Sequence, residues 1–543
     1  MIALVTAVLA QSVSNTAQIQ ATPRPTIGEP FVVELGAATI AGRVHRAEIV
    51  DFGLEVSGIT KSGWFAYRHD RFGKIAVSHS GAEVTRFLQT KSGPQVFVDN
   101  VAVLPGCGGG ISNQTGISNL GGICDSVNSI DLLIPVTPEA VAVAGGDETL
   151  VTSAVQAAVL TSNEVYFNSE LPLRVRAAHI LFLEDSEPEG AGTLLGAMSN
   201  PSDGVFDEIQ IARDEYRADL VALISGNDYP FCGVANLGPD VGSVWSQTLF
   251  GCLAGYTFVH ELGHNMGCCH APGDGGGCDS YSGTAQGHRW TGDSGSLWRT
   301  VMAYSPGAQI PHLSNPSVLY DGVSSGVEGE RDSVAQIFQS RVEISGYRCR
   351  EDGQGDGLLQ FGAATTDPCD SEPSALVAIR WTCESNQAGG FQFSVPGAGL
   401  TDLSVSDAID GDFVTYLLGD TCLIFAEGQI DEDLPGVPAT PPDGVVLANV
   451  TATALASEVS FANVRTISVT GRDIPTDGND AITIPSECIG DVTGDGVVDF
   501  DDQLTVLGQF GQKCNDCSAD LDCDGEVSFQ DVLLVVTIFG PCP

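Results

Sequence analysis

The most constraining feature of this chain is a stretch from His260 to His270, which reads HELGHNMGCCH. Residues four apart on a helix lie one turn apart on the same face, so His260 and His264 can bind one metal ion. Gly267 allows a sharp turn, because glycine accepts positive φ without steric cost, and the turn returns His270 as a third ligand. Three imidazoles leave a fourth position open for water, which is typical of catalytic rather than structural zinc. The pattern therefore predicts a catalytic zinc site.

The alternative is a helix that carries histidines by chance, and a second element argues against it. The chain has only 9 histidines, and three of them fall in this one pattern. Downstream, residues 299–304 read RTVMAY, which matches the methionine-containing turn that follows this long zinc motif. Glu261 stands next to the first ligand, where it can hold a water molecule rather than bind the metal.

Composition excludes some partners and indicates a compartment. The formal net charge is -46, which argues against binding to nucleic acid and against docking on anionic lipid. The 16 cysteines favour an oxidising compartment, with disulfides as the default interpretation. Residues 1–11 resemble a short export signal, within a signal peptide that we place at residues 1–20, although a basic N-terminal region is missing. No run of about 18 apolar residues occurs elsewhere, so no transmembrane segment is expected.

Hydrophobic patterning divides the chain into regions. Residues 21–125 carry short strand-like runs between glycines and are interpreted as a β-rich pro-region. Residues 126–350 alternate strands and helices, which indicates an α/β catalytic domain. Within it, residues 233–237 are a candidate sheet edge for an extended substrate strand, and the active-site helix is expected to begin near Ala254. The expected elements of this domain are strands at 129–136, 175–183 and 220–225 and helices at 149–162 and 203–217.

Residues 126–350 resemble a metzincin zinc endopeptidase, close to the reprolysin-like and secreted bacterial branches. The resemblance implies zinc ligands His260, His264 and His270, the general base Glu261, a methionine beneath the site, Met302, and a tyrosine near the metal, Tyr304. Glu261 would take a proton from zinc-activated water, and Tyr304 would hydrogen-bond the developing oxyanion. The chain departs from reprolysins at Ala271, where they carry Asp, and its Met-Ala-Tyr differs from the Met-His-Tyr of astacins. These departures leave the subfamily and the cleavage specificity open.

A cysteine ahead of this domain is a candidate for latency. Residues 104–109 read LPGCGG, which is similar to the Pro-x-Cys-Gly element of latent metzincins, so the thiolate of Cys107 would occupy the open zinc position. The alternative is a disulfide between Cys107 and Cys124. Cys268 and Cys269, inside the zinc motif, are expected to form disulfides rather than to bind metal. Their candidate partners are Cys232, Cys252 and Cys278.

Residues 357–487 lose helical periodicity and predict a β-sandwich. The region loosely resembles cohesin-like sandwich domains, and a generic structural sandwich is equally compatible with it.

Residues 488–543 contain a repeat of an acidic loop. Two 12-residue loops, which begin at Asp491 and Asp520, place oxygen ligands at positions 1, 3, 5, 9 and 12 and glycine at position 6, as a calcium loop requires. Apolar helices are expected at 503–510 and 532–539. The repeat resembles a dockerin-type pair of calcium-binding units, which implies about two calcium ions and a cohesin-like partner in cis or in trans; the alternative is an acidic turn repeat without metal. The expected calcium ligands are Asp491, Thr493, Asp495, Asp499, Asp502, Asp520, Asp522, Asp524, Ser528 and Asp531.

Together these patterns predict a multidomain protein. An α/β (α+β) metzincin catalytic domain is flanked by a β-rich N-terminal pro-region, a C-terminal β-sandwich and a small α calcium-binding dockerin-like module. The expected function is a secreted or cell-surface zinc endopeptidase that acts on protein or peptide substrates and is made as a zymogen. The alternative from another class is a catalytically vestigial zinc- and calcium-binding adhesion or scaffold protein of the cell surface. Intact Glu261 argues against the alternative, because a lost protease usually loses its base first.

Overall fold

The computed structural model describes residues 18–541 with internal gaps. The residues within this range that it does not describe are 23–24, 51, 71, 102–109, 112–126, 190, 228, 279–280, 350–356, 367–373, 384–387, 408, 410–412, 427–436, 438–443, 456, 470–472, 475, 479, 485–488, 494 and 514–517. Residues 1–17 of the expected signal peptide and Cys107 lie outside the described residues, whereas Gln20, at the end of that expected segment, belongs to the first strand of the N-terminal sheet. The chain divides into two compact units, the first extending to Asp352 and the second beginning at Gly353.

The first unit begins with an eight-stranded antiparallel sheet whose strands pair in chain order. Tight turns join successive strands; at Gly81, between β6 and β7, φ is +64°, a conformation that glycine adopts without steric cost. The β-rich character predicted for this part of the chain is confirmed. The strands are β1 (Gln20–Ala21), β2 (Pro30–Leu35), β3 (Ala38–Val50), β4 (Gly53–Ile59), β5 (Gly63–Asp70), β6 (Gly73–Ser80), β7 (Glu83–Leu88) and β8 (Gln95–Asn100).

A six-stranded mixed sheet forms the centre of the rest of this unit, in the order β11-β10-β12-β14-β13-β9. Strands β11, β10, β12 and β14 are parallel, and β13 runs antiparallel to β14. Parallel neighbours require crossover connections, and helices supply most of them. The strands are β9 (Gly110–Ile111), β10 (Ser129–Val136), β11 (Arg174–Phe182), β12 (Leu220–Ser225), β13 (Gly233–Asn236) and β14 (Trp245–Leu249).

The helices of this part are α1 (Pro138–Val143), α2 (Glu148–Asn168), α3 (Ala191–Ser199), α4 (Glu208–Glu215), α5 (Thr257–Asn265) and α6 (Ser333–Ile344). The predicted ends of two helices were wrong: α2 continues beyond residue 162, and α4 is shorter than the predicted helix at 203–217. The active-site helix α5 begins at Thr257 rather than near Ala254, because Phe250–Cys252 form a separate 3₁₀ turn. Cys252 of that turn is bonded to Cys232, which fixes the entry to α5.

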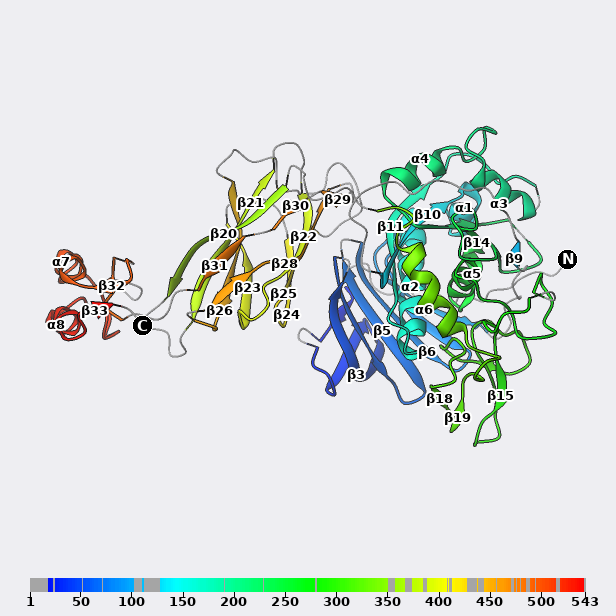
Figure 1. The fold of residues 1–543 in the computed structure, drawn as a ribbon, viewed down its shortest axis with the longest axis horizontal. Helices are drawn as coiled ribbons and strands as arrows, with labels where there is room; N and C mark the ends of the chain where they lie inside the picture. Colours follow the sequence, from blue (N-terminus) through cyan, green and yellow to red (C-terminus); the bar gives the residue numbers. More distant parts are fainter. Residues whose placement is uncertain are drawn as a thin grey trace. The chain divides into compact units, whose positions relative to one another are not determined.

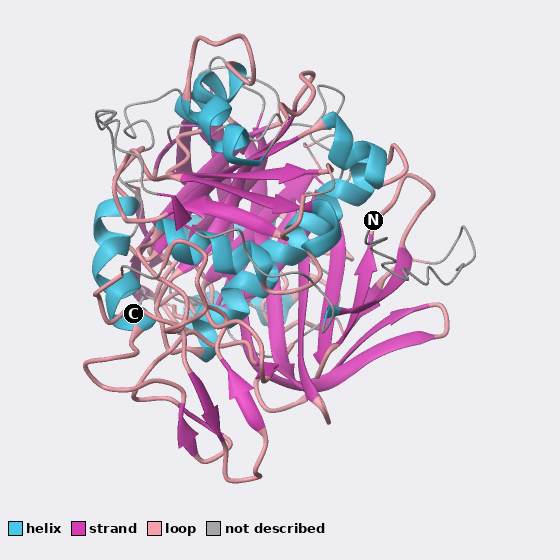
Figure 2. Cartoon of the chain, turned by 90° about the vertical axis from the view of Figure 1, so that its right-hand side faces the viewer, coloured by secondary structure: helices cyan, strands magenta, loops and turns pink. Residues whose placement is uncertain are grey.

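Helix α2 lies between the two sheets (Figure 1). It contacts β5, β6 and β7 of the N-terminal sheet as well as β11 and α5, and every side chain from Ser153 to Tyr166 is buried. The buried Glu164 of α2 is paired with Arg46 of β3. One continuous hydrophobic core includes Trp64 and Val77 of the N-terminal sheet and residues of the central sheet, so the two sheets form one folded body (Figure 2).

Short strands follow α5 and hold the methionine turn. Strand β15 (Arg289–Thr291) pairs antiparallel with β16 (Leu297–Arg299), and β16 pairs parallel with β17 (Ala308–Gln309). The hairpin of β18 (Leu319–Tyr320) and β19 (Val323–Ser324) precedes α6. The methionine turn follows β16 directly. Val301 of this turn donates its backbone N–H to the His312 carbonyl at 2.9 Å, which joins the turn to the segment after β17.

The second unit contains two five-stranded sheets, in the orders β23-β26-β21-β20-β30 and β24-β25-β22-β28-β29, and a small pair, β27 and β31. Trp381 of β21 and Phe391 of β22 lie in one buried cluster that draws on both large sheets, so the sheets share a core. The strands are β20 (Gly357–Thr366), β21 (Ala375–Cys383), β22 (Ala388–Ser394), β23 (Leu400–Val405), β24 (Phe413–Leu418), β25 (Thr421–Ala426), β26 (Val445–Ala452), β27 (Glu458–Ser460), β28 (Ala462–Ser468), β29 (Asp473–Ile474), β30 (Thr476–Asp477) and β31 (Ala481–Thr483).

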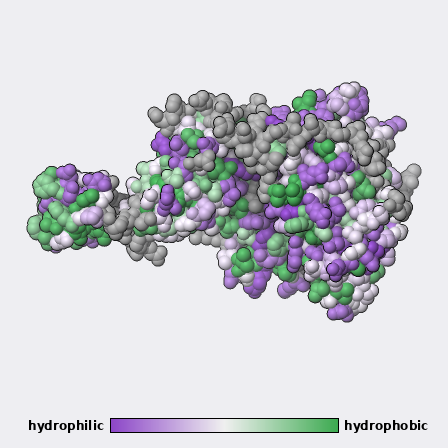
Figure 3. Space-filling model, in the orientation of Figure 1, coloured by the Kyte–Doolittle hydropathy of each residue, from purple (hydrophilic) through white to green (hydrophobic). Residues whose placement is uncertain are grey.

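The last part of the second unit is a pair of short helices, α7 (Phe500–Gly508) and α8 (Phe529–Thr537), with β32 (Val497–Val498) and β33 (Gly540–Pro541). Each helix begins three residues earlier than the sequence predicted, because Asp499 and Ser528 cap the two helices and Asp502 and Asp531 complete the capping boxes. Hydrophobic side chains gather on the surface of this part (Figure 3). Among the described residues, no helix is both long and apolar enough to span a membrane.

Candidate metal centre

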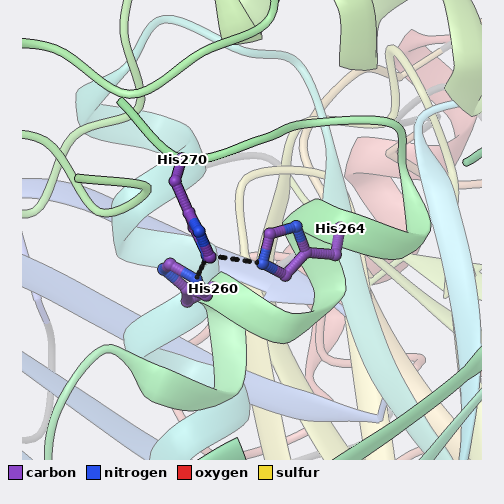
Figure 4. A group of neighbouring side chains, drawn as sticks. All are labelled: His260, His264 and His270. Carbon is purple, nitrogen blue, oxygen red and sulfur yellow. Dashed lines mark hydrogen bonds between the residues drawn. The ribbon is translucent and has the colours of Figure 1, made fainter. Parts of the chain in front are cut away.

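The structure brings the three motif histidines together. His260 and His264 lie on α5, and His270 returns from the loop after Gly267, whose φ is +97° (Figure 4). The His270 Nε2 lies 3.1 Å from the His260 Nε2 and 3.0 Å from the His264 Nε2. All three rings are buried, and their ligand atoms lie within 4.8 Å of one another.

The second nitrogen of each ring faces a backbone carbonyl. The Nδ1 atoms of His260, His264 and His270 lie 2.9, 2.8 and 2.9 Å from the carbonyl oxygens of Val301, Cys268 and Gly275, respectively. A carbonyl oxygen only accepts, so Nδ1 carries the proton in each ring and Nε2 presents a lone pair. Three lone pairs that converge at this distance repel one another unless a cation binds between them, and the donor set therefore fits zinc.

Burial keeps the imidazoles of His260 and His264 neutral. It lowers the pKa of His264 to about 3, with a smaller contribution from the charge of His270, and it lowers the pKa of His260 well below its ordinary value. Neutral imidazole is the form that binds a metal ion, so the rings need not release protons before binding at neutral pH.

Glu261 lies against strand β13. Its side chain is buried, and an ideal Cβ on Gly233 would lie only 2.5 Å from Glu261 Oε1. The missing side chain at Gly233 is therefore what allows the carboxylate to occupy this position. The sequence placed Gly233 in a candidate substrate edge but did not reveal its contact with Glu261, because nothing in its local pattern links it to a residue 28 positions away.

Met302 packs directly beneath the ligand helix. An ideal Cβ on Gly263, between the first two ligands, would lie 2.7 Å from the Met302 sulfur, so glycine permits this close contact. Tyr304 is half-buried, and its ring centroid lies 4.3 Å from that of His270. Met302 therefore lies against the ligand helix, and Tyr304 lies beside His270.

A hydrogen-bonded group that the sequence did not reveal holds Tyr304 in place. Asp274, in the loop after His270, accepts from the backbone N–H of Tyr304 at 2.8 Å and from both Nη atoms of Arg289 at 2.7 Å. Arg289 also donates to the Tyr304 carbonyl at 2.9 Å. The loop of the third ligand and the methionine turn are therefore joined through a partly buried ion pair.

Of the disulfides expected at the motif, only that of Cys269 is present, because two of the candidate partners, Cys232 and Cys252, are bonded to each other. Cys269 is bonded to Cys278, which closes the loop that carries His270, and Cys232 is bonded to Cys252. The expectation for Cys268 was wrong: it is buried and forms no disulfide. Its side chain points away from the ligands, because its thiol lies 3.8 Å from the carbonyl oxygen of Ser333 at the start of α6.

The candidate substrate edge at β13 is paired within this chain. Strand β9 lies parallel to it, with Gly110 opposite Ala235 and Ile111 opposite Asn236. Strand β9 follows Cys107 closely in the sequence. The segment next to the candidate latency residue therefore occupies the edge that an extended substrate would need.

The two acidic loops of the terminal module share one hydrogen-bonding pattern. Asp491 accepts from the backbone of Asp495 and Gly496, and Asp520 accepts from the equivalent Asp524 and Gly525. In the second loop, the carboxylates of Asp520, Asp522 and Asp524 come within 4.8 Å of one another. Burial and the neighbouring carboxylates raise the pKa of Asp522, a repulsion that a bound cation would relieve.

In both loops the aspartate at position 12 turns back into the loop. Asp502 accepts from the backbone of Thr493 and Asp499, and Asp531 accepts from that of Leu521, Asp522 and Ser528. The repeated geometry fits the spacing that the sequence predicted for calcium.

Three buried imidazoles and a buried carboxylate beside an α/β sheet define a zinc metallopeptidase site. In agreement, residues 126–314 match the family Reprolysin_5, described as metallo-peptidase family M12. The chain is 32% identical over 225 residues to a peptidyl-Asp metalloendopeptidase of Stenotrophomonas maltophilia (strain R551-3), covering 40% of this chain and 53% of that protein. It is 31% identical over 225 residues to a peptidyl-Asp metalloendopeptidase of Xanthomonas campestris pv. campestris, covering 40% and 52%.

The chain thus spans about half the length of the curated relatives it matches. These matches, with the histidine triad, support a zinc metalloendopeptidase, a hydrolase of peptide bonds.

Proposed function

We propose that this chain is a secreted zinc endopeptidase that cleaves protein substrates, with Glu261 as its general base, and that it is made as a zymogen. The observation that carries the proposal is the convergence of the Nε2 atoms of three histidines, two of which lie on α5 together with the buried carboxylate of Glu261.

The residues of the site have distinct roles in the proposed reaction. When bound, zinc would activate a water molecule and polarise the scissile carbonyl group. Glu261 accepts a proton from the attacking water and passes it to the leaving amine. Tyr304 donates a hydrogen bond from its hydroxyl to the oxyanion that develops at the carbonyl oxygen, from its place beside His270. Met302 supports the ligand helix from below.

The names of the relatives suggest a substrate preference. Both are peptidyl-Asp metalloendopeptidases, and their similarity to this chain covers the matched metallopeptidase region. We infer that this chain also prefers a peptide bond next to an aspartate residue.

Latency is supported by the pairing of β9 with β13. A substrate strand that binds by β-augmentation would need the same edge, so β9 must leave before cleavage can begin. Cys107, just ahead of β9, is the proposed ligand that blocks the metal. Cleavage between β9 and β10 would release this segment, whereas the N-terminal sheet would stay bound, because it shares a core with α2.

Disulfides and the absence of a membrane-spanning helix among the described residues support an extracellular or cell-surface location. We propose that the terminal module binds about two calcium ions through the ten predicted ligands. The exposed apolar residues of its helices support a cohesin-like partner, in cis or in trans. They lie one turn apart on each helix and are Phe500, Leu504 and Leu507 of α7 and Phe529, Leu533 and Val536 of α8.

The test is digestion of casein by the expressed chain, before and after limited proteolysis, with and without a zinc chelator. Glu261→Gln is the matched variant, because it keeps the size of the side chain and all three histidines but removes the base. We expect the variant to bind zinc and to lose activity by at least about 10²-fold. Equal turnover by the variant, or cleavage that a chelator does not stop, would contradict the proposal.

A further inference from the structure

Two arginines lie side by side next to the methionine turn. Arg289 of β15 and Arg299 of β16 are directly opposite each other in the antiparallel pair. Both Nη atoms of Arg289 are engaged, since each donates to the Asp274 carboxylate and Nη1 also donates to the Tyr304 carbonyl. Asp274 is thus the carboxylate partner of Arg289.

Arg299 has backbone partners and no carboxylate. Its Nε donates to the Gly307 carbonyl at 2.9 Å, and its Nη1 donates to the Ala303 carbonyl at 2.6 Å. Within the part of the chain that the structure describes, no acidic side chain lies within ion-pair distance of Arg299. A guanidinium has five N–H donors, so most of its hydrogen-bonding capacity is available.

The Arg299 guanidinium is still charged at neutral pH. Burial lowers its pKa to about 10, and the positive charge of Arg289 acts in the same direction, whereas Asp274 opposes both. A partly desolvated guanidinium binds a carboxylate more strongly than a fully hydrated one does. Arg299 is therefore a surplus positive charge, in a chain whose net charge is -46.

This charge lies next to the metal ligands. The Ala303 carbonyl that binds Nη1 follows Met302, which packs beneath α5. Two residues after Arg299, the Val301 carbonyl orients His260. The side chain is half-buried, and besides burial its positive charge is among the contributions that lower the pKa of His260.

We propose that Arg299 binds the side-chain carboxylate of the substrate residue next to the scissile bond and so selects aspartate. The inference rests on the proposed function and deepens it, because it names the group that recognises the substrate. The planar guanidinium, held by two carbonyl groups, can offer parallel N–H donors to both oxygens of a carboxylate. An amide of the same shape carries no charge and has only one acceptor oxygen, so it binds less well.

The competing interpretation is that Arg299 only braces the methionine turn through Ala303 and Gly307. Bracing would affect all substrates equally. Recognition would change the ratio of kcat/KM between two peptides that differ only as Asp and Asn next to the scissile bond. This ratio therefore separates the two interpretations.

The experiment uses the activated full chain and this pair of peptides. We expect the wild-type protein to prefer the Asp peptide by about 10²-fold and Arg299→Gln to bring the ratio to within about threefold of unity, chiefly through a higher KM for the Asp peptide. Arg331→Gln is the matched control, because it removes one positive charge from the same unit and Arg331 contacts Gln286 and the Glu330 carbonyl rather than the site. Arg299→Lys keeps the charge but loses the parallel donors, and we expect it to lower the ratio by about tenfold.

Each of the following outcomes would overturn one part of the proposal. An Asp preference that persists in Arg299→Gln would overturn the role of Arg299 and leave the peptidase proposal intact. If the glutamine variant does not fold, an unchanged ratio in Arg299→Lys would overturn the inference. Wild-type protein that cleaves both peptides equally would overturn the aspartate preference and the role of Arg299 together. Absence of any zinc-dependent cleavage would overturn the proposed function itself.

Discussion

Replacing Gly233 with alanine would add one methyl group to β13 at the point where this strand meets the Glu261 carboxylate. An ideal Cβ at this position lies 2.5 Å from Oε1 and 2.8 Å from Cδ of Glu261, whereas ordinary van der Waals contact begins at 3.4 Å. Either the carboxylate must retreat by about 0.9 Å or the strand must move. The strand is held in place, because Cys232 is bonded to Cys252 and its carbonyl accepts from Leu249 at 2.8 Å.

The expected cost follows from the displacement of the base. A misplacement of about 1 Å can lower a rate by roughly 10²-fold, and a general base contributes about 10²–10⁴-fold in total. We therefore expect Gly233→Ala to lower kcat by about 10²-fold. Zinc content should be unchanged, because the added methyl group meets Glu261 and the Gln247 carbonyl rather than a histidine.

The assay is chelator-sensitive cleavage of an Asp-containing peptide, with zinc content and thermal unfolding measured on the same samples. Gly196→Ala in α3 is the matched control, because a Cβ there meets nothing within 4 Å. A Gly233→Ala variant that keeps its zinc, its unfolding temperature and a kcat within about threefold of wild type would refute the reasoning.

Two further predictions concern stability. Burial raises the pKa of Glu55, but the charges of Arg174, Arg68 and Arg46 outweigh this effect and lower the pKa from 4.5 to about 2. The ionised carboxylate therefore stabilises the folded state fully above pH 4.5, and this contribution is lost as pH falls through 2. We expect Glu55→Gln to lower the free energy of unfolding by about 3–5 kcal/mol at neutral pH and to flatten its change between pH 5 and 2. Thermal unfolding of both proteins at several pH values measures this. An unchanged dependence of stability on pH would contradict the prediction. For the terminal module, calcium at about 100 times its Kd should stabilise it by about 2.7 kcal/mol, and titration calorimetry of the full chain should find about two ions, one fewer in Asp520→Asn. Equal stoichiometry in the two proteins would exclude the second loop as a site.

The zinc ligands could be found from the sequence because their geometry is local. His260 and His264 share a face through the helical repeat, and Gly267 permits the turn that returns His270, so eleven consecutive residues specify the set. The acidic repeat could be found from the sequence for the same reason, since the predicted ligands of each loop lie within twelve consecutive residues. The start of α5 was misplaced because a 3₁₀ turn and a disulfide, rather than helix propensity, fix it.

Helix α2 shows where local patterns fail. Its side chains are buried all round, because one sheet covers each side, and its polar residues are used in long-range contacts. Asn163 binds the backbone of Val175, and Glu164 pairs with Arg46, 118 residues earlier in the chain. A helix with no exposed face gives no amphipathic pattern, so its partners cannot be deduced from periodicity.

The sequence by itself determined the chemistry of the centre: three imidazoles, an adjacent carboxylate and a methionine turn. Only the tertiary structure decided what surrounds that centre. It placed Gly233 against Glu261, paired β9 with the substrate edge, and left Arg299 without a carboxylate beside Arg289. The physical reason is that ligand spacing is fixed by the local geometry of a helix and a turn, whereas these contacts depend on how distant segments pack in space.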